Sequence, residues 1–209
     1  LWIRKGIDET PAFKKAQEAG EVSRLPIADT LRYHWKAVLI AMGAKVVETA
    51  PFYIFGTFIV SYATTTLNFN KTDALNAVVI GSLVATIIIP IIGNLSDRIG
   101  RKNIYLFGIA ATILYAFPYF WMLQQGSVFL LILATVIGLG FIWGSVNAVL
   151  GTMISEFFPA KVRNTGISLG YQLGAAFAGG TAPLVATALL ATFNNSFVPV
   201  ALYMILAAI

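Results

Sequence analysis

Two oppositely charged residues lie inside a long apolar run in the first quarter of the chain. Lys45 and Glu48 occur in the stretch AMGAKVVETAPFYIFG, three positions apart. Side chains at this spacing are neighbours on one face of a helix, so each charge can neutralise the other. A charged group surrounded by lipid is costly and is a functional candidate by default. We therefore predict that Lys45 and Glu48 face a water-filled cavity and take part in charge coupling or substrate contact.

A less specific interpretation applies to the same pair. Lys45 lies only about 12 Å from the start of the apolar run at Ala37, at a helical rise of about 1.5 Å per residue, so its side chain can extend to the membrane surface. Glu48 lies one turn deeper. Pro51 follows the pair and removes a backbone hydrogen bond, which often marks a bend near a binding site.

Polar residues also interrupt two later apolar runs. Trp143 and Asn147 are four positions apart in FIWGSVNAVLG, and Tyr171 and Gln172 are adjacent in ISLGYQLG. They offer hydrogen-bonding groups and flat aromatic surfaces that could shape a cavity. The alternative is that such residues only bond a neighbouring helix.

The elements that carry these residues are predicted from composition. Of 209 residues, 58% are hydrophobic and 11% are charged, whereas about a quarter are charged in soluble domains. Apolar runs of about 18 or more residues indicate membrane-spanning helices, and IGSLVATIIIPIIG lacks the alternation of a barrel strand. We predict an all-α polytopic membrane protein with a bundle of six helices. The expected spans are Ala37–Thr65, Ala74–Leu95, Ile104–Leu123, Val128–Phe157, Thr165–Phe193 and Phe197–Ile209, the last truncated.

The distribution of basic residues predicts how the chain is oriented. Nearly all of the 14 lysines and arginines lie before the first span or in the turns on the same side. The positive-inside rule places residues 1–36 in the cytoplasm, as a linker or interfacial helix before the transmembrane bundle of residues 37–209. This topology explains the basic excess and excludes a nucleic-acid partner. His34 is predicted to be an interfacial residue rather than a proton carrier, and the aromatic residues Tyr119–Trp121 an interfacial belt at the opposite end.

Enzyme chemistry has no support in the sequence. The chain has no cysteine and one histidine, and it lacks CxxC, HExxH and any carboxylate cluster with metal-ligand spacing. We therefore expect no catalytic residues, no metal and no cofactor. A channel built from several copies is a remaining alternative, which ion conduction would reveal.

Small residues recur at intervals of four in the fifth span. Gly166, Gly170 and Gly174 are followed by Ala178. Such rows allow two membrane helices to approach closely, so we predict a helix-packing surface.

A charged stretch between the second and third spans reads GNLSDRIGRK. We expect it to form a tight cytoplasmic turn, with Gly93 and Gly100 permitting the change of direction. It resembles the signature loop of the major facilitator superfamily, roughly GxLxDRxGRK. The matching residues are Gly93, Leu95, Asp97, Arg98, Gly100, Arg101 and Lys102.

Two further stretches resemble the same superfamily. EFFPAKVRNTG, which contains Glu156 and Arg163, is similar to an ExxPxxxRxxG element at the cytoplasmic end of a fourth span. IRKGIDETPAF looks like the segment after the sixth span in the metabolite:proton symporter branch. The resemblance implies that the chain is the C-terminal half of a twelve-helix transporter. It also implies that Asp97, Arg98, Arg101, Glu156 and Arg163 form a cytoplasmic gating network, although a solvated positive turn is the alternative.

The resemblance also implies a function. The expected activity is secondary active transport of a small carboxylate or zwitterion by alternating access, coupled to protons, across the plasma membrane (the inner membrane of a bacterium). A facilitative or exchange transporter of the same fold is the alternative. The implied partners are the metabolite, the proton, the lipid bilayer and the missing N-terminal half, and we expect the isolated half to be able to self-associate.

Overall fold

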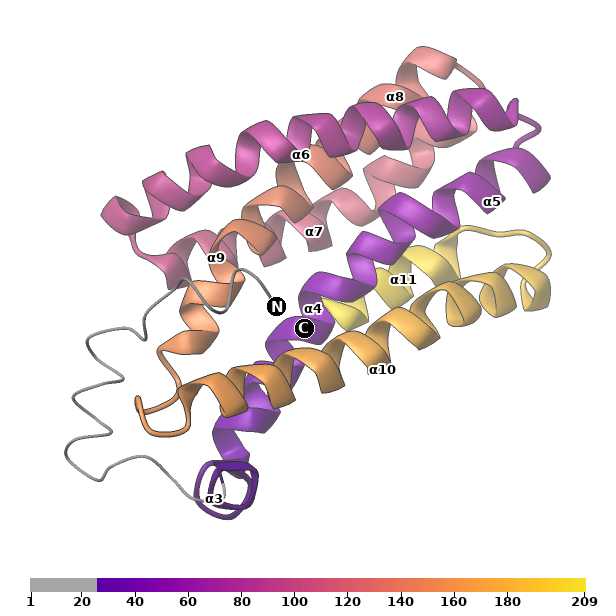
Figure 1. The fold of residues 1–209 in the computed structure, drawn as a ribbon. Helices are drawn as coiled ribbons and strands as arrows, with labels where there is room; N and C mark the ends of the chain where they lie inside the picture. The colour runs from indigo at the N-terminus through magenta and orange to yellow at the C-terminus, as the bar shows by residue number, and fades with distance from the viewer. Residues whose placement is uncertain (1–25) are drawn as a thin grey trace, which may run out of the picture.

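The structure is a computed structural model that describes residues 26–209; the expectations for residues 1–25 lie outside this range. Within it every regular element is a helix, as Figure 1 shows. In chain order the elements are α3 (Pro26–Tyr33), α4 (Trp35–Tyr53), η1 (Ile54–Phe58), α5 (Ile59–Thr65), α6 (Lys71–Ile99), α7 (Arg101–Gln124), α8 (Val128–Thr135), η2 (Val136–Trp143), α9 (Gly144–Ser155), α10 (Arg163–Thr192) and α11 (Val198–Ala207).

These elements combine into long rods. Five rods are long and apolar enough to cross a membrane: Trp35–Thr65, Lys71–Ile99, Arg101–Gln124, Val128–Ser155 and Arg163–Thr192. The all-α membrane fold is thereby confirmed. The sixth predicted span corresponds to α11, an apolar helix of only 10 residues.

The rod formed by α4, η1 and α5 occupies the middle of the bundle. In Figure 1 it runs diagonally, with α10 and α11 on one side and α6 to α9 on the other. α10 packs along α4, α6 packs on α8, η2 and α9, and α11 packs on α7. Side chains on α4 can therefore reach both groups of helices.

Aromatic residues fill the core at the Thr65 end of this rod. Phe55 meets Tyr119 edge to face with ring centroids 4.9 Å apart, and Tyr62 meets Phe120 in the same way at 5.7 Å. Tyr119 and Phe120 are fully buried, whereas Trp121 is exposed. The predicted interfacial belt is thus wrong for Tyr119 and Phe120, because both rings pack against aromatic residues of the central rod.

The small residues of α10 line its contact with α4. A Cβ atom added at Gly170 would lie 2.5 Å from Cβ of Ala41, and one added at Gly174 would lie 2.6 Å from the carbonyl oxygen of Met42. Both distances are shorter than van der Waals contact, so this interface requires glycine. The close approach brings α10 side chains next to those of α4.

Two rods contain π-helical segments, which the sequence did not predict. η1 begins three residues after Pro51, and η2 ends at Trp143. The two segments lie against each other, and a Cβ atom at Gly138 would lie 2.8 Å from the ring of Phe55. π-Helical turns are rare and often occur at functional sites.

Candidate functional site

Lys45 and Glu48 form an ion pair inside the bundle. Only 8% of Lys45 and 3% of Glu48 is exposed. The Lys45 ammonium donates to Oε2 of Glu48, and the hydroxyl of Thr49 donates to the same oxygen at 2.9 Å. Lys45 therefore does not extend to the membrane surface, because its charge is neutralised one helical turn along α4.

The second carboxylate oxygen of Glu48 is bonded from the neighbouring rod. The indole Nε1 of Trp143 donates to Oε1 at 2.9 Å, and the amide Nδ2 of Asn147 donates to it at 3.4 Å. Trp143 is the last residue of η2, and Asn147 lies in the first turn of α9. With Lys45 and Thr49, this makes four donors, which matches the about four lone-pair sites of an ionised carboxylate.

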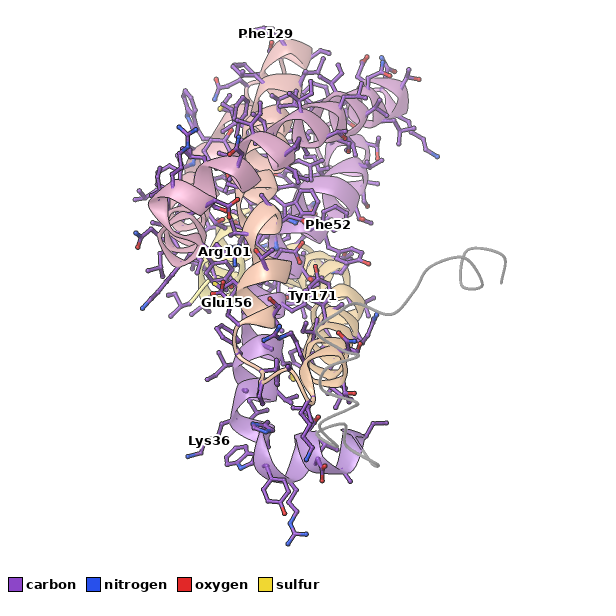
Figure 2. All side chains as sticks on the ribbon, turned by 60° about the vertical axis from the view of Figure 1, so that its left-hand side comes forward. Lys36, Phe52, Arg101, Phe129, Glu156 and Tyr171 are labelled. Carbon is purple, nitrogen blue, oxygen red and sulfur yellow. The ribbon has the colours of Figure 1, made fainter. Side chains whose placement is uncertain are left out.

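Aromatic rings enclose the ion pair. Lys45 Nζ lies 4.0 Å from the ring centroid of Tyr171 on α10, within cation–π range. The ring of Phe52 packs on Trp143 at a centroid distance of 4.7 Å. Figure 2 shows Phe52 and Tyr171 in the middle of the bundle, between Phe129 at one end and Lys36 at the other.

Five of the six predicted site residues thus come together around one carboxylate. They are Lys45, Glu48, Trp143, Asn147 and Tyr171. Gln172 does not join them: its side chain is exposed, because a step of one residue turns it away from the face that Tyr171 presents to Lys45.

Tyr105 supports this site and was missed by the sequence interpretation. Its hydroxyl donates to the carbonyl oxygen of Ala44 at 2.9 Å, which links α7 to α4 one residue before Lys45. Tyr105 is one of three tyrosines in its apolar run, and nothing in the sequence distinguishes it from the other two.

Arg101 forms the centre of a second charged cluster, at the start of α7. Its Nη1 donates to Oε1 of Glu156, and its Nη2 donates to Oδ1 of Asp97 at 3.2 Å. The three side chains are 33%, 57% and 64% exposed, respectively. One arginine thus joins the end of α6 to the end of α9, and Figure 2 shows Arg101 and Glu156 side by side.

The rest of the predicted gating network is arranged differently. Arg163, the first residue of α10, donates through Nε to the carbonyl oxygen of Phe158 at 3.2 Å, in the connection before it. Arg98 is exposed, and neither ion pair of the cluster includes it. Gly93 lies inside α6, which continues to Ile99, so the expectation that Gly93 forms part of the turn is wrong. Gly100 alone makes the turn, with φ of 99°.

A cavity of about 840 Å³ opens beside this second cluster. Asp97, Arg101 and Glu156 line it together with apolar residues of α4 and α7. Lys45 and Glu48 are not among its lining residues, although Ala44 and Tyr105 are. This cavity is therefore not the water-filled cavity that we predicted around the ion pair.

Metal binding finds no support in residues 26–209, where no three residues of the His, Cys, Asp and Glu types lie together. The two clusters consist of ion pairs and hydrogen bonds. Both depend on side chains from rods that are far apart in the sequence.

Comparison with known proteins identifies the family. Residues 1–183 match the profile of the Major Facilitator Superfamily. The chain belongs to this superfamily. It is accordingly a multi-pass membrane protein of a transporter family and not an enzyme.

Several curated relatives in the superfamily are similar over most of this chain. The shikimate transporter of Escherichia coli K12 is 29% identical over 207 residues, which cover 98% of this chain and 47% of the relative. The citrate-proton symporter of Klebsiella pneumoniae is 28% identical over 188 residues, which cover 90% of this chain and 42% of the relative. The proline/betaine transporter of Escherichia coli K12 is 25% identical over 221 aligned positions, which cover 100% of this chain and 43% of the relative.

The chain spans somewhat less than half the length of these relatives. No solved structure gives a significant match.

Proposed function

We propose that this chain is the C-terminal half of a twelve-helix transporter that carries a small carboxylate or zwitterion together with a proton. Residues 1–36 then lie in the cytoplasm, and a second six-helix bundle faces this one. The names of the relatives support the substrate class, since they include shikimate, citrate-proton and proline/betaine transporters. The matches cover less than half of each of these relatives, which supports the proposal that a second half belongs to the full-length protein.

The observation that carries the proposal is the buried ion pair of Lys45 and Glu48. A buried charge is tolerated only when it is paired and hydrogen-bonded, as both charges are here. Glu48 is the proposed proton acceptor. When it takes up a proton, Lys45 loses its counter-ion and attracts a substrate carboxylate, so that one proton and one carboxylate enter together.

The surrounding side chains have distinct parts in this scheme. Trp143 and Asn147 hold the ionised Glu48 from η2 and α9, and a protonated Glu48 requires fewer donors from them. Tyr171 keeps the ammonium of Lys45 over its ring while the counter-ion changes. Because these residues come from three rods, protonation changes the contacts between the rods.

The Arg101 cluster is the proposed gate. Its two ion pairs join the ends of α6 and α9 at one face of the bundle. We propose that they hold this end in one arrangement and open in the other, as the two halves rock against each other.

Transport by the full-length protein tests the proposal. The protein is reconstituted in liposomes, and uptake of radiolabelled shikimate, citrate, proline and betaine is measured with and without an inward proton gradient. Glu48→Gln keeps the size of the side chain and one accepting oxygen but cannot carry a proton. We expect this variant to lose gradient-driven accumulation and to retain exchange of substrate across the membrane.

Asp73→Asn is the matched control, because it also neutralises a carboxylate but lies at the start of α6, away from the site. It should accumulate substrate normally. Normal accumulation by Glu48→Gln would remove Glu48 from the mechanism.

One observation favours the alternative of facilitative or exchange transport. The ionised Glu48 already has four donors, so it is stable in place without a proton. Uptake by the unmodified protein that does not depend on external pH would support this alternative.

A further inference from the structure

The first helix that the structure describes lies across the end of the bundle. α3 ends at Tyr33, and His34, with φ of −127° and ψ of 20°, interrupts the helix before α4 begins at Trp35. Figure 1 shows α3 nearly end-on beneath α4, which runs across the view. In Figure 2 α3 crosses the same end of α4. If α4 crosses the membrane, α3 lies along the membrane surface.

One side of α3 faces the protein and another does not. Thr30 is fully buried where α3 packs on α4 and α10. Ile27 and Leu31, one helical turn apart, are 60% and 49% exposed. Apolar side chains on a helix that lies along the surface can enter the boundary between headgroups and acyl chains.

The corner after α3 alternates basic and aromatic residues. The guanidinium carbon of Arg32 lies 5.4 Å from the ring centroid of Tyr33, and Lys36 Nζ lies 5.8 Å from that of Trp35. All four side chains are exposed. Tyrosine and tryptophan collect at the level of lipid headgroups, so these contacts place both cations beside the phosphates.

We propose that α3 and the corner Tyr33–Lys36 bind anionic phospholipid headgroups. Ile27, Leu31 and the two aromatic rings enter the interface, and Arg32 and Lys36 contact the phosphates. Charge complementarity selects the lipid: in the part of the chain that the structure describes, each of the two exposed cations contacts an aromatic ring, and Asp29, the acidic residue of this segment, is only partly exposed. This role concerns the surrounding membrane rather than the transported solute, so it is independent of the proposed function.

Quenching of tryptophan by brominated lipid tests the proposal on the 209-residue chain. Trp35 is kept as the sole tryptophan by changing Trp2, Trp121 and Trp143 to Phe, and the chain is reconstituted in phosphatidylcholine. Equal fractions of brominated phosphatidylglycerol or brominated phosphatidylcholine are then added. We expect phosphatidylglycerol to quench Trp35 at least about twofold more strongly, because its charge enriches it at the two cations.

Two comparisons make the result specific. Arg32→Gln combined with Lys36→Gln should bring the two lipids to equal quenching of Trp35. A chain with Trp121 as sole tryptophan should show equal quenching throughout, since Trp121 is similarly exposed and has no basic residue beside it in the sequence. Equal quenching of Trp35 in the presence of both cations would overturn the proposal, and so would the absence of quenching by either lipid, which would mean that protein covers this surface.

A second measurement avoids the tryptophan substitutions. The otherwise unmodified chain is released from mixed-lipid nanodiscs, and the phosphatidylglycerol that remains bound is counted by native mass spectrometry. We expect the chain to retain more of this lipid than its Arg32→Gln, Lys36→Gln variant. Equal retention would overturn the proposal.

Discussion

The two charged clusters use the same chemistry in opposite surroundings. In each, a basic side chain pairs with a carboxylate one helical turn away, and Arg101 also pairs with Glu156, 55 positions along the chain. However, Lys45 and Glu48 are almost completely buried, whereas Asp97 and Glu156 are more than half exposed. Water can replace the partners of an exposed ion pair, and it cannot replace those of a buried one. The buried cluster is therefore suited to respond to a proton or a ligand, and the exposed cluster is suited to open and close.

The largest expected effect comes from breaking the buried pair on one side only. Lys45→Met or Glu48→Leu leaves one buried charge without its partner, which costs about 3–5 kcal/mol in the free energy of unfolding. The double variant should recover most of this loss, because no charge remains. Unfolding of the purified chain in detergent measures all three variants. Losses that simply add in the double variant would contradict the interpretation of a coupled pair.

A smaller effect on stability is expected from changing one glycine to alanine near each cluster. A Cβ atom at Gly174 would lie 2.7 Å from Cβ of Lys45, so Gly174→Ala should push α4 and α10 apart and cost about 1–3 kcal/mol. The matched change Gly93→Ala, near the exposed cluster, meets no atom within 4 Å. It should stabilise α6 by up to about 1 kcal/mol, since alanine is the better helix former.

The same unfolding assay in detergent compares these two glycine variants. Similar losses for both would show that the close approach of α10 to Lys45 has no special part in stability.

The smallest effect is expected at the exposed cluster. Glu156→Gln removes a partner of Arg101 that solvent can replace, so the Tm should change by no more than about 4 °C. Asp97→Asn, which removes the other partner, should behave in the same way. A fall in Tm as large as that of Lys45→Met would remove the distinction between the two clusters.

Residue type and spacing predicted much of the buried site. The interval of three between Lys45 and Glu48 indicated a shared helix face, and Trp143, Asn147 and Tyr171 were singled out as polar or aromatic residues in apolar spans. These features do not show which atoms meet. The three residues meet at one ion pair because of how the rods pack. The sequence does not predict this packing, because a membrane helix that is apolar on all sides gives little indication of which face points inward.

The misplaced residues have local causes. Gln172 was grouped with Tyr171 because the two are adjacent, yet adjacent helical residues do not share a face. Gly93 was assigned to a turn because the charged stretch begins there, but α6 continues past it to Ile99. η1 and η2 carry no sequence pattern that separates them from α-helix, and Arg163 bonds a backbone carbonyl that no motif marks.

The single residue between α6 and α7 limits how these helices can move. Gly100 is the only link, and its φ of 99° is a conformation that other residues rarely adopt. Such a short joint has little slack, so the ends of α6 and α7 must stay together when either helix moves. The seven residues between α9 and α10 leave those two helix ends more room to move apart.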